Sequence, residues 1–390
     1  MLPRIERTKN KTQKILEKQQ TKEEKKLPSQ RQSYCCEKVS GQGAFGTVYK
    51  AKCLETGETF AVKKIKQDNE YKSRELELLQ TFTHPNIINL KDFFVEKSDD
   101  YKSTYLNLVT DFYPETLSHV LNYVRVTIKK ECVPMLLIRL YTFQLLRALT
   151  YLHGSHQVAH RDIKPQNLLI DPNGQRLALC DFGSAKKLSN PKEKSVSYIS
   201  TRYYRAPELL LCSEHYGVEI DLWAAGCVLA EMLRGGRVLF EGKSNADQLA
   251  KVMMLFGTPT ESQAAKLNNK YNHSKMPYVD PQPISNYFPP STPKEAIDLV
   301  LSLLNYDPDQ RLSAARCLAH PFFNPLRDEK TTLADGSPLP KSLFDFTEEE
   351  LQYMRKIGGG GKLIESIIPK WQREQRDRQN RLKRACTKRR

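Results

Sequence analysis

The chain has 390 residues, of which 39% are hydrophobic and 27% are charged. This length accommodates one large two-part core or two ordinary domains, and the composition is typical of a folded protein in water. No apolar run approaches the roughly 18 residues that a spanning helix needs, so we expect no transmembrane segment and no signal peptide. Nine cysteines without a C-x-x-C pair indicate free thiols in a reducing compartment, which argues against a disulfide framework or a zinc site.

The net charge of +16 is confined to the two ends of the chain. Residues 1–31 hold ten Lys/Arg against four Glu, and residues 355–390 hold thirteen Lys/Arg against three acidic residues. These balances of +6 and +10 leave residues 32–354 neutral. Net charge therefore does not make the folded body a nucleic-acid-binding surface, although the basic tails can bind polyanions.

The first third of the chain predicts a basic arm followed by a sheet. Residues 1–33 are rich in Lys, Gln and Glu and poor in aromatic side chains, which is typical of a disordered or loosely helical arm. Across residues 34–112, short β-prone runs alternate with turn residues. One helical stretch, residues 71–83, interrupts these runs and ends before His84-Pro85.

The remainder of the chain predicts helices. Apolar residues recur at spacings of three and four between residues 134 and 154, which indicates an amphipathic helix. Residues 221–233 are apolar nearly all round, as in a central buried helix, and Gly235-Gly236 end it. A small antiparallel sheet with one helix, followed by a larger helical part, predicts an α+β fold of two lobes, residues 34–112 and 113–323.

Four polar side chains at fixed spacing carry the strongest chemical signal. Asp162 stands in the run H-R-D-I-K-P-Q-N, which also contains Lys164 and Asn167. Asp181 opens a D-F-G triplet nineteen residues after Asp162. The first carboxylate can orient and deprotonate a hydroxyl, Lys164 can meet phosphate charge, and the other two residues can hold Mg²⁺. An Asx-rich turn does not explain this spacing together with A-P-E at residues 206–208, so the pattern predicts a protein-kinase catalytic loop.

Two structural roles follow from the same kinase pattern. We expect Glu208, which closes the activation segment, to pair with Arg311 in D-Q-R-L at residues 309–312. We expect Asp221 to anchor the catalytic loop by accepting hydrogen bonds from its backbone N–H groups.

A glycine-rich run matches G-x-G-x-x-G-x-V and predicts a hairpin over the phosphates of ATP. With the residue before it, the expected nucleotide-binding set is Ser40, Gly41, Gln42, Gly43, Ala44, Phe45, Gly46, Thr47 and Val48. The run lacks G-K-[ST], which argues against a P-loop, and its β-rich surroundings argue against a Rossmann site. Taken alone, the run is better explained by an ordinary glycine-rich hairpin turn than by nucleotide binding. Ser40 stands where an aliphatic residue usually covers the adenine.

Three further positions complete the predicted nucleotide site. Strand alternation turns Ala61 and Lys63 to the same side, and Lys63 is expected to meet the α- and β-phosphates. Its expected ion-pair partner is Glu75 on the following helix. Between the lobes, the Asp111 carbonyl and the Tyr113 backbone are expected to bind adenine.

Several stretches are more specific than these general motifs. They are D-F-G-S-A-K-K-L at residues 181–188, S-Y-I-S-T-R-Y-Y-R-A-P-E-L-L at 197–210 and F-G-T-P-T at 256–260. From about residue 36 to about residue 350 the chain closely resembles the glycogen synthase kinase-3 family of the CMGC group. The resemblance implies a serine/threonine protein kinase that uses ATP and Mg²⁺, with a kinase domain at 34–323, a C-terminal extension at 324–354 and a basic tail at 355–390 tethered by glycines.

The same resemblance implies a substrate preference. Kinases of this family favour substrates already phosphorylated four residues C-terminal to the target, and three basic residues grip that phosphate, here Arg74, Arg161 and Lys186. Convergent charge-assisted donors are what a doubly charged phosphate needs. The alternatives are surface charge pairing for Arg74 and a phosphorylated activation loop for Arg161. Tyr198 matches the autophosphorylated activation-loop tyrosine of the family, with Arg202 and Arg205 expected to pair with it.

The expected partners are pre-phosphorylated protein substrates and scaffold proteins, although Ser274 and Met276 replace aromatic residues in the scaffold-binding loop of the family. The inhibitory R-x-x-S motif of regulated members is absent from residues 1–33. A pseudokinase scaffold and a nucleic-acid-associated protein are the rival hypotheses. The first predicts loss of a catalytic residue, and the second predicts a basic body. We expect a cytoplasmic protein. For the basic clusters within residues 381–390, the alternatives are a nuclear-import signal, a surface that binds nucleic acid or anionic lipid, and a solvated, partly helical tail.

Overall fold

The computed structural model describes residues 4–5, 32–43, 46–67, 73–98, 103–130, 132–188, 190, 193–359 and 361–374. Ala44, Phe45, most of the N-terminal arm and the basic clusters of the tail lie outside these ranges. The chain divides into two compact units, Met1–Thr83 with Ile87–Tyr113, and His84–Asn86 with Pro114–Arg390. The first is built on an antiparallel sheet and the second on helices, which confirms the predicted two-lobed α+β fold. Within the described ranges, no helix is long and apolar enough to cross a membrane.

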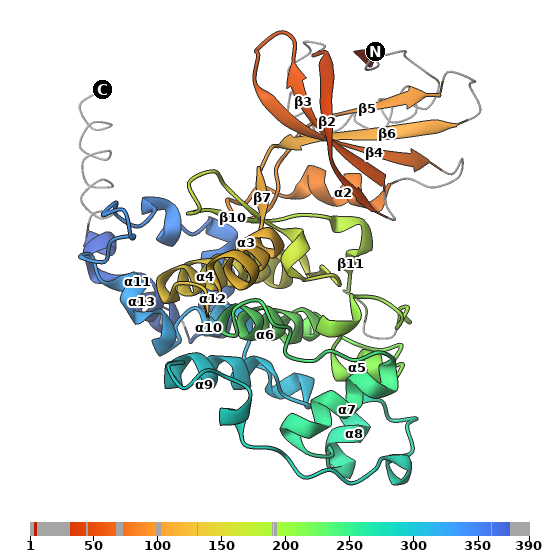
Figure 1. Ribbon diagram of the computed structural model, residues 1–390, viewed down its shortest axis with the longest axis vertical. Coiled ribbons are helices and arrows are strands. Elements are labelled where there is room, and N and C mark those ends of the chain that lie inside the picture. The colour runs from red at the N-terminus through yellow and green to blue at the C-terminus, as the bar shows by residue number, and fades with distance from the viewer. Residues whose placement is uncertain are drawn as a thin grey trace. The chain divides into compact units, whose positions relative to one another are not determined.

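The sheet of the first unit has the strand order β1-β2-β3-β4-β6-β5, and all neighbours are antiparallel (Figure 1). Its strands are β1 Arg4–Ile5, β2 Tyr34–Gly43, β3 Gly46–Cys53, β4 Thr59–Gln67, β5 Leu90–Lys97 and β6 Thr104–Asp111. The two-residue strand β1 pairs with Tyr34 and Cys35 of β2, a feature that the prediction of a disordered or loosely helical arm does not include. A strand of two residues is too short to show the alternation of apolar and polar residues by which strands are predicted.

The core of this sheet fixes the register of β4. Val62 and Val109 face each other across β4 and β6 and are fully buried. The Tyr34 ring stacks on Phe94, with ring centroids 6.0 Å apart. Since alternate residues of a strand point to opposite faces, burying Val62 directs its neighbour Lys63 to the other face.

Helix α2 (Arg74–Thr81) begins at a side-chain cap. The Ser73 hydroxyl accepts a hydrogen bond from the Leu76 amide, which satisfies one of the unpaired donors of the first turn. The helix therefore starts three residues later than predicted, and residues 68–72 lie outside the described ranges.

The second unit contains short strands and the remaining helices (Figure 1). The strands are β7 Glu115–Thr116, β8 Val158–Ala159, β9 Leu168–Ile170, β10 Leu177–Leu179 and β11 Lys186–Lys187. The helices are α3 Leu117–Tyr123, α4 Met135–Tyr151, α5 Pro207–Leu210, α6 Glu219–Leu233, α7 Asn245–Phe256, α8 Glu261–Leu267, α9 Lys294–Leu303, α10 Ala314–Cys317, α11 Asn324–Arg327, α12 Glu348–Ile357 and α13 Lys362–Ile367.

Helices α4 and α6 form the centre of this unit. Every residue of α6 after Glu219 is buried, as its apolar sequence predicts. Gly235 and Gly236 follow it with φ values of 63° and 83°, which glycine adopts most readily, and they end the helix as predicted. The helix predicted at 134–154 is α4, which passes into a π-helical turn, Leu152–His156.

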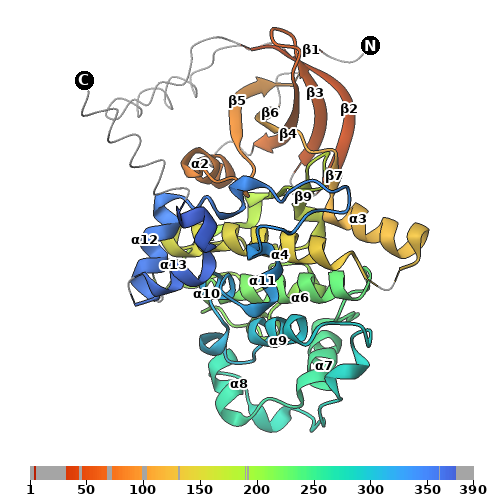
Figure 2. The ribbon, with the colours of Figure 1, turned by 90° about the vertical axis from the view of Figure 1, so that its left-hand side faces the viewer.

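The glycines after α12 form a turn, which differs from the predicted flexible tether. The Gly358 amide donates to the Met354 carbonyl and caps α12, and a Cβ at Gly358 would collide with Leu363. Helix α13 then packs back onto the unit beside α12 (Figure 2), with Ile367 fully buried. The Trp371 indole N–H donates to the Arg327 carbonyl at 3.1 Å. Residues 361–374 are therefore part of the folded body.

This packing gives a test by truncation. We expect deletion of residues 362–390 to lower the free energy of unfolding by at least about 2 kcal/mol, because it exposes the sites of two buried isoleucines, Ile367 and Ile368. Deletion of residues 375–390 is the matched control and should leave stability unchanged. Chemical denaturation of the three proteins measures the difference. Equal stability of both deletions to the full chain would mean that α13 contributes nothing to the fold.

Candidate active site

In the first unit, Lys63 is held in a buried ion pair. Its Nζ lies 2.8 and 2.9 Å from the two carboxylate oxygens of Glu75. Glu75 is 6% exposed, whereas Glu77 on the same helix is exposed. The predicted pairing of strand β4 with helix α2 is confirmed. The bidentate contact fixes the position of the ammonium group on β4.

The glycine-rich hairpin has two kinds of glycine. Gly46 adopts φ 135°, and a Cβ there would collide with the Lys64 carbonyl oxygen, so the fold itself requires glycine. At Gly41 and Gly43 a Cβ would meet no described atom within 4 Å. Packing within the described residues does not explain these two glycines, whereas close approach of a ligand to the backbone does.

The other predicted nucleotide-binding residues of the first unit lie on strand ends. Asp111 ends β6, pairs in the ladder with Phe60, and its carboxylate contacts Lys91 Nζ at 3.0 Å. Its side chain is thus engaged, which leaves its backbone as the adenine contact that the sequence predicts. Tyr113 is the last residue of the unit, and Ser40 is exposed on β2.

In the second unit, Asp221 anchors the segment that carries Asp162. Its buried carboxylate accepts hydrogen bonds from the amides of His160 at 2.7 Å and Arg161 at 2.9 Å. The His153 ring lies 2.9 Å away through Nε2. Burial opposes ionisation of Asp221, but these donors outweigh it and hold its pKa below the ordinary value. Arg161 can therefore keep a left-handed backbone with φ 68°.

Four donors converge on the Asp162 carboxylate. Lys164 Nζ lies 2.7 Å from Oδ2, and Asn167 Nδ2 lies 3.1 Å from the same oxygen. The amide and the hydroxyl of Thr201 both donate to Oδ1 at 3.1 Å. Lys164 also donates to the Thr201 hydroxyl at 3.1 Å. The carboxylate is thereby fixed in one orientation, next to a cation.

Asp181 follows a strand that is tied to the same segment. The amide of Cys180 donates to the Asn167 carbonyl at 3.0 Å, and His160 Nε2 donates to the Cys180 carbonyl at 2.9 Å. Asp181 itself has φ 63° and ψ 75°. Asn167 directs its amide nitrogen at Asp162, so its amide oxygen remains as the atom able to ligate a cation.

Asn167 and Asp181 are suited to Mg²⁺ that is also bound by substrate phosphates and water, and not to a metal ion enclosed by protein ligands alone. The described residues contain no cluster of three His, Cys, Asp or Glu able to hold a metal ion. Mg²⁺ is usually held by one or two carboxylate or amide oxygens together with substrate phosphates and water. One carboxylate, Asp181, and one amide oxygen, that of Asn167, match this requirement.

The activation segment, residues 182–208, is fastened at its end. Glu208 and Arg311 form a buried bidentate ion pair, with both contacts at 2.7 Å, as the sequence predicts. Arg205 lies 4.7 Å from the centre of the Tyr198 ring, which is 72% exposed, whereas Arg202 donates to the Lys243 carbonyl. Of the two arginines expected beside Tyr198, the structure places Arg205 there.

The three residues predicted to grip a priming phosphate belong to different units. Arg74 is the exposed first residue of α2 in the first unit. In the second unit, Lys186 Nζ contacts the Glu193 carboxylate at 2.6 Å and the Ser195 hydroxyl at 3.1 Å. Arg161 donates to the Ser184 carbonyl and to the Tyr216 hydroxyl.

The family model of the protein kinase domain matches residues 34–323. The chain belongs to the protein kinase family. The kinase uses ATP and Mg²⁺ as protein kinases do, and its substrates are proteins. The Lys63–Glu75 pair and the Asn167–Asp181 set fit these ligands. The rival of a pseudokinase predicts loss of one of Lys63, Asp162, Asn167 or Asp181, and all four are present.

The sequence alone did not indicate that Thr201 contacts the predicted catalytic residues. Thr201 contacts both Asp162 and Lys164, yet it lies 39 and 37 residues from them in the chain. No local pattern marks such a contact. The only available signal is its position shortly before Ala206-Pro207-Glu208 in the run that resembles the family.

We expect Thr201→Val to lower kcat/KM by roughly ten- to a hundredfold, since it removes hydrogen bonds to a carboxylate and an ammonium group. Thr201→Ser keeps the hydroxyl and should stay within about threefold of the wild-type kinase. Steady-state phosphorylation of a peptide measures both variants. Equal activity of the two would show that the Thr201 hydroxyl has no part in the reaction.

Proposed function

We propose that this kinase is a serine/threonine protein kinase of the glycogen synthase kinase-3 type. It would transfer the γ-phosphate of ATP to Ser or Thr hydroxyls of proteins, preferring substrates that carry a phosphate four residues C-terminal to the target. The observation that carries the proposal is the convergence of Lys164 and Thr201 on the Asp162 carboxylate. A lysine two residues after the catalytic aspartate favours Ser/Thr over Tyr kinases, which usually carry an arginine further along.

The chemistry is divided among the chain's own side chains. Asp162 accepts the proton of the substrate hydroxyl as its oxygen bonds to the γ-phosphorus, and the bond to the β-phosphate oxygen breaks to release ADP. Lys164 neutralises charge that develops on the transferred group. Asn167 and Asp181 would hold Mg²⁺, which would offset the negative charge of the phosphates when bound.

Nucleotide binding falls to the first unit in this proposal. Lys63, fixed by Glu75, meets the α- and β-phosphates, and the backbone at Gly41 and Gly43 approaches the phosphates. The backbones of Asp111 and Tyr113 bind adenine. Both the Lys–Glu pair and the metal-binding aspartate are required in an active protein kinase.

The primed-substrate preference rests on Arg74, Arg161 and Lys186. It is supported by the environment of Lys186, whose ammonium group already contacts a carboxylate and a hydroxyl, the kinds of oxygen a phosphate presents. The exposed Tyr198 beside Arg205 supports phosphorylation of this tyrosine by the kinase itself, as the family resemblance implies.

The preference is tested with two peptides that differ by one phosphoserine four residues beyond the target. We expect Lys186→Ala to lower kcat/KM for the primed peptide by about tenfold and to spare the unprimed one. Lys187→Ala is the matched control, because Lys187 is the exposed neighbour on the same strand. Equal losses on both peptides, or equal effects of the two lysine variants, would contradict a phosphate pocket at Lys186.

The metal role is tested at Asp181. We expect Asp181→Asn to abolish transfer of radiolabelled phosphate from ATP at every Mg²⁺ concentration, because it removes a ligand charge from an otherwise unchanged fold. Circular dichroism and the melting temperature serve as the control for folding. A folded variant with substantial activity would rule out the assigned role.

A further inference from the structure

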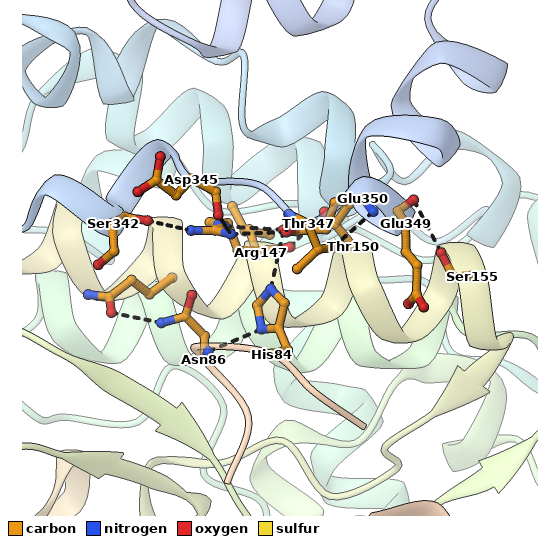
Figure 3. Close-up of polar contacts among 12 residues, drawn as sticks. His84, Asn86, Arg147, Thr150, Ser155, Ser342, Asp345, Thr347, Glu349 and Glu350 are labelled. Carbon is orange, nitrogen blue, oxygen red and sulfur yellow. Dashed lines mark hydrogen bonds and ion pairs between the residues drawn. The ribbon is translucent and has the colours of Figure 1, made fainter. Parts of the chain in front are cut away.

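The connection between α2 and β5 is held by the C-terminal extension. His84–Asn86 belong to the second unit, although the chain before and after them belongs to the first. The His84 side chain is buried and points at Glu350 of α12, as Figure 3 shows. Glu350 lies beyond residue 323 and thus outside the part of the chain that matches the protein kinase domain.

Glu350 is the counter-charge of a buried arginine. Arg147 of α4 is 1% exposed, and its Nε and Nη2 donate to the two Glu350 oxygens at 3.1 and 2.9 Å. Its remaining donors go to the carbonyls of Ser342, Leu343 and Asp345. All five N–H groups of the guanidinium are therefore satisfied, which a buried cation requires. The pair locks α12 and the preceding residues 342–345 onto α4.

His84 extends this network to residues 84–86. Its Nδ1 accepts a hydrogen bond from the Asn86 amide at 3.1 Å, so a neutral ring carries its proton on Nε2. That nitrogen lies 3.3 Å from Glu350 Oε1, a favourable charge–dipole contact with imperfect hydrogen-bond geometry. Burial lowers the pKa of His84, which keeps the ring neutral beside the Arg147–Glu350 pair.

Asn86 carries the network to the strand before Asp181. Its side-chain nitrogen donates to Gln144 at 2.8 Å and to the Leu177 carbonyl at 2.9 Å, and its own carbonyl accepts from the Leu179 amide at 2.9 Å. Leu177 and Leu179 are the two ends of β10. Asp181 follows two residues later. A continuous series of contacts thus runs from Glu350 to the strand that positions Asp181.

We propose that Glu350 and His84 are positioning residues of this kinase, through which the C-terminal extension fixes residues 84–86. That segment steadies β10, which leads to Asp181. Packing alone does not require charge at such a place, because apolar side chains of similar volume usually stabilise at least as well. The kinetic part of the test rests on the proposed function, and the structural part does not.

The test compares two full-length variants that each lose hydrogen-bonding nitrogen but keep an aromatic ring. His84→Phe retains stacking on Tyr151, whose ring lies 5.0 Å away, and leaves the Arg147–Glu350 pair intact. Trp371→Phe is the matched control, since it removes a donor to the Arg327 carbonyl from a residue that follows the extension. Glu350→Gln is a less suitable first variant, because it leaves the buried guanidinium uncompensated and can prevent folding.

Hydrogen exchange is measured by mass spectrometry well below the melting temperatures, together with kcat for a peptide substrate. We expect His84→Phe to speed exchange of the Asn86 and Leu179 amides and to lower kcat, each by about tenfold, the effect of roughly one lost hydrogen bond. Trp371→Phe should leave both at wild-type values. The proposal is overturned if exchange in residues 82–88 and 177–183 is the same in the two variants, or if their kcat values are equal. Exchange needs no activity, so it decides the anchoring even if the proposed specificity fails.

Discussion

The buried carboxylate of Asp221 holds the backbone from which the reactive groups of the second unit project. It accepts the amides of His160 and Arg161 and thereby permits a left-handed residue at Arg161. A non-glycine residue in that conformation costs about 1–2 kcal/mol, which two charge-assisted hydrogen bonds can offset. Once Arg161 is fixed, Asp162 is directed toward Lys164, Asn167 and Thr201. The arrangement proposed for phosphoryl transfer therefore depends on one carboxylate that does not itself react.

Elsewhere in the second unit, polar contacts fix other segments in the same way. Glu208 and Arg311 hold the end of the activation segment in place, and Thr201 of the same segment donates to Asp162. Arg147 and Glu350 fasten the C-terminal extension to α4. Each contact joins residues that are remote in the chain. In each, a charged side chain forms hydrogen bonds with its partner. Phosphoryl transfer depends on positioning and charge stabilisation more than on covalent chemistry, so such rigidity suits the activity of a protein kinase.

The sequence predicted those parts of the site whose partners lie at motif positions. The Lys63–Glu75 and Glu208–Arg311 pairs and the anchoring by Asp221 could be assigned because each member stands in a recognisable run. The two-lobed fold was predicted because strand-like patterns occupy residues 34–112 and helical spacing of apolar residues begins near residue 134. For the same reason, the buried helix α6 and its glycine end were predicted almost to the residue.

The sequence did not reveal contacts that depend on tertiary structure alone. Thr201 stands in an ordinary polar run, and Arg147 interrupts an apolar helix as a surface arginine would, with its partner Glu350 203 residues away. The glycines after α12 have the composition of a flexible linker, but Gly358 is required because Leu363 occupies the space of a side chain. Composition predicts how flexible a segment is in isolation. It does not predict the packing of α13, which depends on a surface formed by residues distant in the chain.

The most direct test of the proposed serine/threonine specificity is phosphorylation of three peptides identical except for Ser, Thr or Tyr at the acceptor position. The purified kinase, radiolabelled ATP and Mg²⁺ are used, and the acceptor is identified by phosphoamino-acid analysis. Asp162, held by Lys164 and Thr201, is proposed to serve an aliphatic hydroxyl, so the account predicts phosphoserine and phosphothreonine and no phosphotyrosine in the peptides. Phosphate on the tyrosine peptide, or on none of the three, would contradict it.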